Sequence, residues 1–439
     1  MSTVNKLPPN WSWVKLGDVC ETTSGGTPSR KNPKYYDGKI PWIKSGELNY
    51  NTIQDSEEKV TKEALENSNA KIFPKGTLLI ALYGATVGRL AILGINATTN
   101  QAIAAIFTPS NLLNKFLYWF LFSYREKLLK QRIGGAQPNI SQATLRNIPI
   151  PLPPIPEQKK IVEKIEELFS GLDSGVASLK KAKELVRLYR QSVLTAAFSG
   201  KLTTNKTPTV NGGINNEQLI IKNEKEKNNS SLPTGWKWVK TSDIIEHIDN
   251  GYTPKANLMS SGNGEIPFIK VYNLTFDGRL DFTKTPTFIS NETHKKNLKR
   301  SITIPNDVLI NIVGPPLGKV SIVPDSHKEW NINQAIVRFR PNKNITSKFL
   351  SYYLQNPNTM KWLESTSRAT AGQYNIRVST CREIPIPQIS VNEQHQIVSE
   401  IEKRFSEADN LEKAIDDSLE KSEALRQSIL SRAFSGKLV

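Results

Sequence analysis

The feature that most constrains the fold is an internal repeat that runs almost from one end of the chain to the other. Residues 190 to 203 read RQSVLTAAFSGKLT and residues 426 to 439 read RQSILSRAFSGKLV, with ten of the first thirteen positions identical. The beginnings match too, as LPPNWSWVK at residues 7 to 15 and LPTGWKWVK at residues 232 to 240. A repeat of this extent predicts two copies of one folding plan.

The parts of the two copies have diverged to different degrees. The first 140 or so residues of each copy match only in short stretches, whereas the last 50 or so match closely. The short matches are TSGGTPSR with DNGYTPKA, GTLLIALYGATVGRLAI with NDVLINIVGPPLGKVSI, AQPNI with GQYNI, and an NQAI that begins at Asn100 and at Asn333. The closely matched stretch begins with IPIP and passes through Glu-Gln to the repeated ending. We therefore expect the matched stretches to share a task and the diverged parts to differ in theirs.

The matched stretches are predicted to be long amphipathic helices. Their apolar residues recur at spacings of three, four and seven, with Pro156 at the first start and Gly200 and Gly436 after the two ends. A helix of about 40 residues would reach roughly 60 Å and would leave its apolar stripe in water, so we expect the two to pack as a coiled coil. Gly171 and Gly175 are expected to interrupt the first helix, because glycine costs about 1 kcal/mol relative to alanine. The predicted stripe comprises Ile161, Ile165, Leu168, Leu172, Leu179, Leu185, Leu188 and Val193, and then Ile397, Ile401, Phe405, Ala408, Leu411, Ile415, Leu419, Leu425 and Ile429.

The diverged parts are predicted to be mixed α/β domains, which makes the whole chain α+β. Short β-rich runs such as TLLIALYG, LAILGI and AIAAIF are separated by glycine, proline and asparagine, and an aromatic helix follows near residues 116 to 129. A polar, turn-rich stretch before the second copy is expected to be a flexible linker. The expected division is a first domain at 1–150, a long helix at 151–203, a linker at 204–231, a second domain at 232–388 and a long helix at 389–439.

The positive charge of the chain lies almost entirely in the diverged parts. The formal net charge is +17, and it favours a polyanionic partner, either a nucleic acid or a membrane surface. Residues 1 to 150 carry 18 basic and 10 acidic side chains, and residues 232 to 388 carry 20 and 12, so each part has an excess of eight. The final stretch, residues 389 to 439, carries 7 and 10. We therefore expect the domains to contact the polyanion and the helices to serve as scaffold and docking surface.

The sequence favours a cytoplasmic protein that does not enter a membrane. The longest apolar run, from Leu112 to Tyr124, is too short to span a bilayer and contains Lys115. The N-terminal residues show no apolar signal segment. Two isolated cysteines, Cys20 and Cys381, do not suggest a disulfide framework and fit a reducing compartment.

No catalytic motif was found in the sequence. GPPLGKV at residues 314 to 320 lacks the spacing and the hydroxyl residue of a phosphate-binding P-loop, and SGNGEIP at 261 to 267 lacks a third glycine. The four histidines are scattered without partners at metal-ligand spacing. VPDSHKEW at 323 to 330 has no counterpart with carboxylates in the first copy, so it is a poor nuclease candidate. Recognition is therefore a better interpretation than catalysis.

The candidate contact residues lie in loops that combine glycine with basic and amide side chains. These loops are residues 23 to 34 and 132 to 140, with counterparts at 249 to 257 and 368 to 376. Their side chains are of the types that reach phosphates and base edges. A structural turn is the alternative for Asn139 and Asn375, and a solvated surface position for Lys44 and Lys270; the NQAI pair is expected to be a packing or turn element. The candidates are Arg30, Lys31, Lys34, Lys44, Arg89, Arg132, Gln137, Asn139, Lys255, Lys270, Lys319, Arg368, Gln373 and Asn375.

The two diverged domains begin with LPPNWSWVKLGDV and LPTGWKWVKTSDI, and each is followed by IPIP, Glu-Gln and a long helix ending in AFSGKL. In these features the chain resembles the specificity subunit of Type I restriction-modification enzymes. The resemblance covers all of the chain except the linker. It implies two target-recognition domains, each reading one half of a split DNA site, and two long helices packed as an antiparallel pair. It also implies a pseudo-twofold internal repeat. The length of the linker departs from the family pattern and puts its part in the domain spacing in doubt.

The resemblance further implies the partners and the absence of catalysis. The expected partners are double-stranded DNA, two methyltransferase (modification) subunits and the restriction (helicase-nuclease) subunits. The chain is expected to hold no catalytic residues and no cofactor, because S-adenosylmethionine, ATP and magnesium would belong to the partner subunits. The alternative reading is a coiled-coil adaptor whose basic domains bind RNA or protein; a free-standing nuclease would need a motif that the sequence lacks.

Replacing Arg132 or Arg368 by alanine is expected to weaken DNA binding. The loss should be about 1 to 3 kcal/mol if the side chain pairs with a guanine. Titration of labelled duplexes with each variant measures it, and unchanged affinity in both variants would remove these two residues from the candidates.

Overall fold

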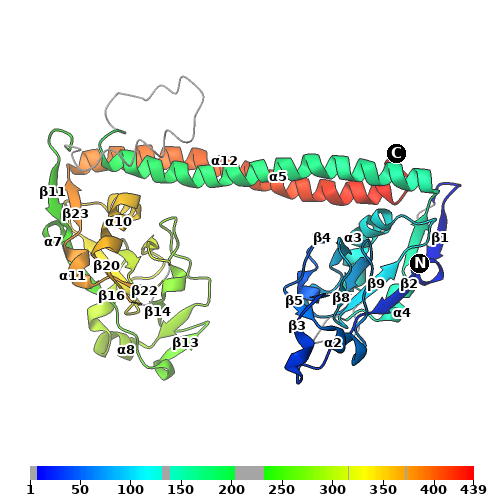
Figure 1. Cartoon of the computed structure of the whole chain (residues 1–439). Helices are drawn as coiled ribbons and strands as arrows, with labels where there is room; N and C mark the ends of the chain where they lie inside the picture. Colours follow the sequence, from blue (N-terminus) through cyan, green and yellow to red (C-terminus); the bar gives the residue numbers. More distant parts are fainter. Residues whose placement is uncertain (1–6, 131–138, 203–231, 315, 371–372) are drawn as a thin grey trace. The chain divides into compact units, whose positions relative to one another are not determined.

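The computed structural model describes residues 7–130, 139–202, 232–314, 316–370 and 373–439 (Figure 1). The chain forms two compact units. Unit 1 comprises Met1–Lys180 and Asp416–Val439, and unit 2 comprises Lys181–Ile415. Both boundaries fall inside the long helices α5 (Ile155–Phe198) and α12 (Val391–Ala433), so each unit contains one part of each helix.

Unit 1 contains a central sheet with the strand order β2-β9-β6-β7-β4, a second sheet β5-β3-β8 and a ribbon β1-β10. All neighbours in the central sheet are antiparallel except β4 and β7, and β3 and β8 are also parallel. The strands are β1 (Ser12–Lys15), β2 (Glu21–Ser24), β3 (Tyr36–Ile43), β4 (Thr52–Ile53), β5 (Glu58–Val60), β6 (Leu78–Ala81), β7 (Leu90–Leu93), β8 (Thr98–Thr99), β9 (Ile103–Phe107) and β10 (Pro149–Leu152). The shorter helices are α1 (Leu16–Val19), α2 (Lys62–Glu66), α3 (Asn114–Lys130) and α4 (Gln142–Arg146), with single turns η1 (Pro33–Tyr35), η2 (Ser45–Glu47) and η3 (Gly84–Thr86).

Unit 2 repeats this plan with a central sheet β12-β20-β17-β18, a second sheet β13-β15-β14-β19-β16 and a ribbon β11-β23. The parallel pair β3 and β8 of the second sheet recurs as β14 and β19. The strands are β11 (Lys237–Lys240), β12 (Ile245–Asn250), β13 (Met259–Ser261), β14 (Ile266–Ile269), β15 (Thr287–Ile289), β16 (Ile302–Thr303), β17 (Val308–Asn311), β18 (Val320–Ile322), β19 (Trp330–Ile332), β20 (Ile336–Pro341), β21 (Arg368–Thr370), β22 (Gln373–Asn375) and β23 (Pro385–Gln388). The helices are α7 (Thr241–Ile244), α8 (Asn291–Lys296), α9 (Ser347–Gln355), α10 (Pro357–Thr366) and α11 (Val378–Arg382), with turns η4 (Ala256–Leu258), η5 (Val271–Asn273) and η6 (Lys299–Ser301).

The central strand of each unit is apolar on both faces because it lies between two packed layers. In β6, Leu78 faces the core formed with α3 and the long helices, and Leu79 faces the core formed with the second sheet. In β17, Val308 faces the core formed with the long helices, and Leu309 faces the core formed with the second sheet. Since successive residues of a strand point to opposite faces, this sandwich explains the continuous apolar runs that the sequence analysis assigned to strands.

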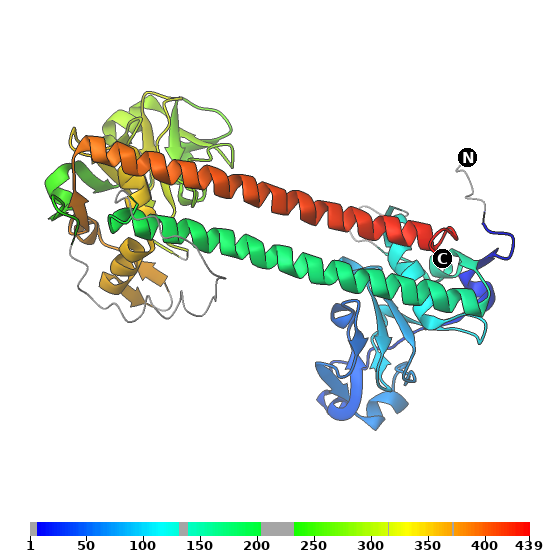
Figure 2. The ribbon, with the colours of Figure 1, turned by 90° about the horizontal axis from the view of Figure 1, so that it is seen from above.

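The two long helices confirm the predicted helical stretches and their ends. Pro156 lies in the first turn of α5, and Gly200 and Gly436 follow the helix ends with φ of +74° and +71°. This left-handed conformation is favourable for glycine after a helix end. The segments of the two helices lie side by side within each unit (Figure 2).

The helices run antiparallel, as the resemblance implied. In unit 2, Lys183 of α5 contacts Glu412 of α12 at 3.8 Å, and the later residue Arg190 reaches back to the main-chain oxygen of Phe405 at 3.5 Å. In unit 1, the guanidinium of Arg426 lies 4.6 Å from the centre of the Phe169 ring. The two contacts in unit 2 fix the antiparallel direction, and the contact in unit 1 shows that the helices are also packed there.

The prediction that Gly171 and Gly175 interrupt the first helix is wrong. α5 continues through both residues. Both are exposed, and a side chain at either position would meet no other atom within 4 Å. The helix on each side of them is fixed by packing, and this outweighs a propensity cost of about 1 kcal/mol per glycine.

The predicted apolar stripe is also wrong at four positions. Leu185, Leu188, Leu411 and Leu425 are between 43% and 55% exposed. Val186 is buried instead, and charged side chains occupy part of the contact face, because Arg190 pairs with Asp409 at 2.7 Å and with Glu412 at 2.9 Å. Spacing alone could not distinguish Leu185 from its neighbour, and it could not foresee that ion pairs would replace apolar contacts.

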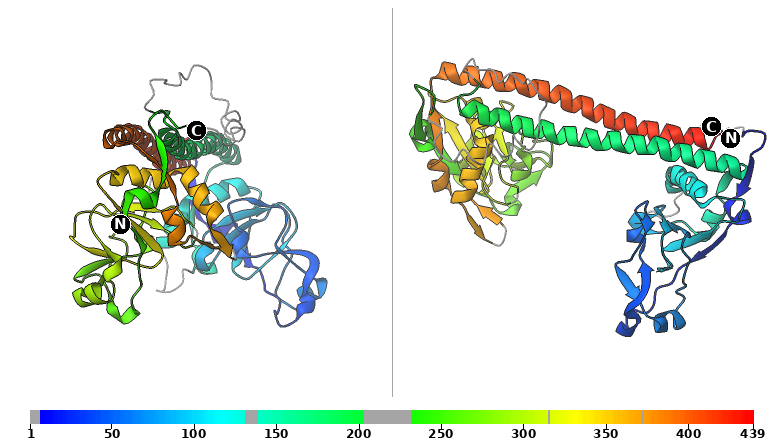
Figure 3. Two further views of the ribbon diagram at one scale, coloured as in Figure 1. Left: turned by 90° about the vertical axis from the view of Figure 1, so that its left-hand side faces the viewer. Right: turned by 45° about the horizontal axis from the view of Figure 1, so that its top comes forward.

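The repeated AFSGKL endings complete the cores of the two units. In unit 1, Phe434 at the end of α12 packs edge-on against Phe116 and Phe120 of α3, which lies against the long helices (Figure 3). In unit 2, Phe198 at the end of α5 packs in the same manner against Phe349 and Tyr353 of α9. The repeated sequence is therefore a repeated core contact.

A glycine at the end of the first central-sheet strand allows a close crossing in each unit. After β2, Gly25 passes so near Thr99 and Asn100 that a side-chain carbon would lie under 3.0 Å from their backbone oxygens. Gly251, after β12, passes Ile332 and Asn333 in the same way. Both glycines donate a main-chain hydrogen bond to the last sheet strand, at 3.2 Å and 3.1 Å. These crossings fix where the following loops leave the sheet.

Replacing Phe434 by alanine is expected to destabilise unit 1 by about 3 kcal/mol or more, because the substitution leaves a cavity among buried aromatic rings. Phe198→Ala should do the same to unit 2. Hydrogen exchange at increasing denaturant concentration measures the stability of each unit separately. Ile72→Ala, at an exposed site in unit 1, is the control. Equal effects of Phe434→Ala and Ile72→Ala would contradict the proposed core role.

Gly25→Ala and Gly251→Ala are each expected to cost about 1 to 3 kcal/mol, because the new methyl group overpacks a backbone crossing. Gly46→Ala is a matched control, since nothing lies within 4 Å of the added carbon. Thermal unfolding of the three variants provides the measurement; a cost at Gly46 as large as at Gly25 would show that crowding is not the cause.

Candidate nucleic-acid interface

The loops singled out in the first copy meet at one end of the unit 1 central sheet. In the antiparallel register, Ser24 at the end of β2 is paired with Ala104, and Ala81 at the end of β6 is paired with Ile103. The chain segments after β2, after β6 and before β9 therefore lie together. We call this the loop end of unit 1.

Hydrogen bonds hold these segments to one another. Gly26 N donates to Thr99 O at 2.9 Å, and the Tyr83 hydroxyl donates to Gln101 O at 2.9 Å. Asn139, a predicted candidate, forms a backbone bridge with Tyr83. Asn139 thus lies at the loop end, while Arg132 and Gln137 lie outside the described residues.

The same arrangement recurs in unit 2. Ile312 N donates to Ala335 O, and Ile376 N donates to Ile312 O, both at 2.9 Å. Asn375 forms a backbone bridge with Val313, as Asn139 does with Tyr83. The other two candidates from this loop, Arg368 and Gln373, lie on the paired strands β21 and β22. Their side chains lie outside the described part of the structure. Each unit thus has a loop end built from corresponding segments.

Arg30 and Lys44 lie beside the loop end of unit 1 and share carboxylate partners. Arg30 pairs with Glu58 at 2.7 Å, and Lys44 pairs with Glu58 at 3.1 Å and with Glu57 at 2.8 Å. The hydrogen bond from Arg30 lowers the pKa of the Glu58 carboxyl, so Glu58 is charged at neutral pH. These two cations are therefore largely neutralised within the protein, a feature that the sequence analysis did not anticipate.

Arg89 and Lys319 occupy corresponding positions just before β7 and β18. Arg89 donates to the Asn49 side chain at 2.9 Å. Lys319 lies 5.8 Å from the centre of the Phe276 ring, which is 56% exposed. Each basic side chain therefore rests against the loop that follows the short turn η2 or η5.

The other predicted basic candidates are more scattered. Lys31 and Lys255 are exposed in the loops after β2 and β12, and Lys270 follows β14, with its ammonium 5.9 Å from the Tyr272 ring. Lys34 lies beside the start of α2, because its main-chain oxygen accepts a hydrogen bond from the Thr61 hydroxyl at 3.2 Å.

The NQAI elements are turns, as expected, but their position was not foreseen. Asn100 N donates to Ile43 O at 2.9 Å, and Asn333 N donates to Ile269 O at 3.1 Å, so each turn joins the central sheet to the second sheet. Gln101 and Gln334 are exposed at the loop ends. The repetition of NQAI was the signal that could have found them.

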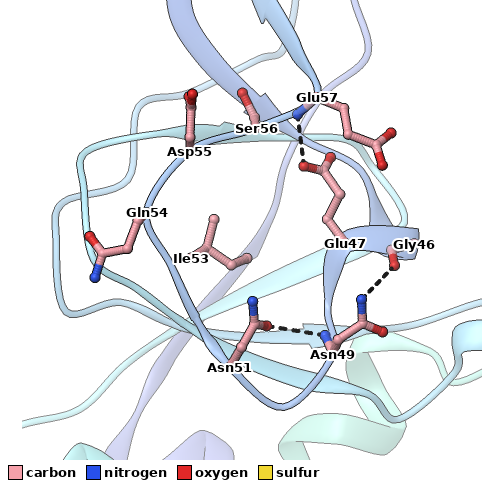
Figure 4. A pocket seen from close by; sticks show the side chains of 9 residues that line it. All are labelled: Gly46, Glu47, Asn49, Asn51, Ile53, Gln54, Asp55, Ser56 and Glu57. Atoms are coloured by element: carbon pink, nitrogen blue, oxygen red, sulfur yellow. Dashed lines mark hydrogen bonds between the residues drawn. The ribbon is translucent and has the colours of Figure 1, made fainter. Parts of the chain in front are cut away.

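A pocket of about 460 Å³ lies near Lys44 in unit 1 (Figure 4). The Glu47 carboxylate closes one side by accepting hydrogen bonds from the main-chain nitrogens of Lys44 at 2.7 Å and Glu57 at 3.0 Å. The lining consists of Gly46, Glu47, Asn49, Asn51, Ile53, Gln54, Asp55, Ser56 and Glu57. Its three carboxylates make this pocket unsuitable for a phosphate group.

The described residues offer little for metal or thiol chemistry. In these parts of the chain there is no cluster of three or more histidine, cysteine, aspartate or glutamate side chains that could hold a metal ion. Burial raises the pKa of Cys20 to about 11 and that of Cys381 to about 12, so both thiols stay protonated at neutral pH. No helix among the described residues is long and apolar enough to cross a membrane.

Comparison with known proteins identifies the family. The family model described as Type I restriction modification DNA specificity domain matches residues 8–181 and 233–421. The specificity subunit of the Type I restriction enzyme EcoBI of Escherichia coli is 30% identical over 348 residues, covering 78% of this chain and 69% of that protein. The MjaIX specificity subunit of Methanocaldococcus jannaschii is 28% identical over 328 residues, covering 73% and 71%.

Two solved structures share the fold. A chain from a structure of complex assembly in the type I R-M system superposes with a TM-score of 0.73 at 21% identity, covering 99% of this chain and all of that one. The HsdS subunit from Thermoanaerobacter tengcongensis gives a TM-score of 0.55 at 20% identity, with 99% of each chain covered. The structures show a shared fold, and the match of the family model together with the 30% identical relative shows that the chain belongs to the family of Type I restriction-modification specificity subunits.

Proposed function

We propose that this chain is the DNA-recognition subunit of a Type I restriction-modification complex and that it reads a bipartite, non-palindromic site. The observation that carries the proposal is the duplicated loop end. Corresponding loops meet at the end of the central sheet in both units, and they belong to the domains whose sequences have diverged between the two copies. Residues 1–150 and 232–388 would be the two target-recognition domains.

The charge distribution supports DNA as the ligand. The two domains carry nearly all of the net positive charge, and electrostatic attraction to phosphates supplies a large share of the affinity of a protein for DNA. Base edges would then be read by loop side chains that differ between the domains. One domain has Tyr83 where the other has Val313 in the corresponding backbone bridge, so the two half-sites should differ.

The matched long helices support a docking role. Because their sequences have stayed alike, they can bind identical partner surfaces twice, which fits two methyltransferase (modification) subunits. Restriction (helicase-nuclease) subunits would complete the complex. We place S-adenosylmethionine on the modification subunits and ATP with magnesium on the restriction subunits. This chain would hold no catalytic residues and would work in the cytoplasm.

Exchanging residues 1–150 for the same segment of another family member is expected to change one half of the methylated sequence and leave the other half intact. The chimaera is purified with its modification subunits, and methylated positions are mapped on a randomised duplex library. The reciprocal exchange of residues 232–388 is the matched control and should change the other half.

A change of both halves in either chimaera would contradict the division of labour between the domains. DNA recognition itself is tested by titrating the unaltered complex with duplexes of different sequence and with RNA. Equal binding of all duplexes, or a preference for RNA, would contradict it. The slope of log affinity against log salt concentration then shows how many phosphates are neutralised.

A further inference from the structure

Arg30 is an exposed cation that contacts two aromatic rings and a carboxylate. Its guanidinium carbon lies 4.3 Å from the centre of the Tyr36 ring and 5.1 Å from that of Trp42. One terminal nitrogen pairs with the Glu58 carboxylate at 2.7 Å. The side chain is nevertheless 55% exposed, so much of the guanidinium remains open to a ligand.

The two rings are themselves fixed to the loop that carries Arg30. The Tyr36 hydroxyl donates to Pro28 O at 2.7 Å, and the Trp42 indole nitrogen donates to Gly26 O at 3.0 Å. Gly26 in turn is bonded to the turn beside Asn100. The position of Arg30 is therefore defined relative to the loop end of unit 1.

Other arginines show that this combination is unusual. Among the described residues, Arg190 and Arg426 also lie over aromatic rings, but their side chains are only 22% and 18% exposed. Arg187 is 57% exposed and pairs with Glu184, but no ring contact is found for it in the described part of the chain. Within that part, Arg30 is the arginine that is stacked, paired with a carboxylate and more than half exposed.

The local charge favours a base edge over a phosphate as the ligand of Arg30. Glu58 neutralises much of the charge of Arg30, and Glu57 lies on the other side of Lys44. Nearby carboxylates repel a phosphate, whereas a guanine edge is neutral and needs only donors for its O6 and N7. A stacked and paired arginine also loses little side-chain entropy on binding.

We propose that Arg30 reads a guanine in the half-site contacted by unit 1, and that Tyr36, Trp42 and Glu58 are positioning residues for it. This inference rests on the proposed DNA-recognition function. The second copy has Ala256 at the position that matches Arg30 in the sequence repeat, so the contact should be confined to one half-site.

The test uses the complete methyltransferase complex and a randomised duplex library, with methylated sequences as readout. Arg30→Ala is expected to relax one base position of one half-site, with a loss of discrimination of about 10- to 100-fold. Arg30→Lys keeps the charge but not the forked donors, so it should not restore the guanine preference. Glu58→Gln should weaken discrimination at the same position. Lys115→Ala, which changes another exposed cation of unit 1 with a carboxylate partner, should leave the methylated sequence unchanged.

The outcomes separate this inference from the function on which it rests. If the unaltered complex shows a bipartite sequence but Arg30→Ala lowers methylation of all sequences equally, or Arg30→Lys restores it, Arg30 contacts phosphate and the proposal is wrong. An unchanged methylated sequence in Arg30→Ala also overturns it. If the unaltered complex has no sequence preference, the recognition function itself fails.

Discussion

The structure depends on the burial of the two repeated helix ends. Phe434 closes the core of unit 1 against α3, and Phe198 closes that of unit 2 against α9. Each core lies beneath a central sheet whose inner strand is apolar on both faces, so its stability requires a cover on the helix side. The helix ending AFSGKL occurs twice because each unit needs a phenylalanine at this place to close its core.

The loop ends take no part in this cover, so their side chains are free to vary. The loop ends are built from turns whose backbone bonds recur in both units, from Ile140 to Leu82 in one and from Ile376 to Ile312 in the other. Because main-chain hydrogen bonds hold the framework, side chains on it can change without altering the path of the chain. A recognition protein needs this separation between a constant backbone and variable side chains.

The sequence predicted those features that depend on local chemistry or on the repeat. Helix starts and ends at Pro156, Gly200 and Gly436 follow from residues whose backbone preferences are strong. The sequence could not predict the pairing of Arg30 with Glu58, because these residues come from different elements and meet only through the fold. It was wrong about Leu185 and Leu411, since periodicity identifies a helical stripe but not which neighbouring residue faces the partner helix. It was also wrong about Gly171 and Gly175, where packing outweighs propensity.

The composition of unit 1 has a consequence for biosynthesis. Unit 2 is a continuous segment, Lys181–Ile415, whereas unit 1 joins Met1–Lys180 to Asp416–Val439. During translation, the first 180 residues leave the ribosome long before the segment that contains Leu430 and Phe434. Unit 1 must wait with an uncovered apolar face while unit 2 is completed, and the first part made is the last to reach its final packing.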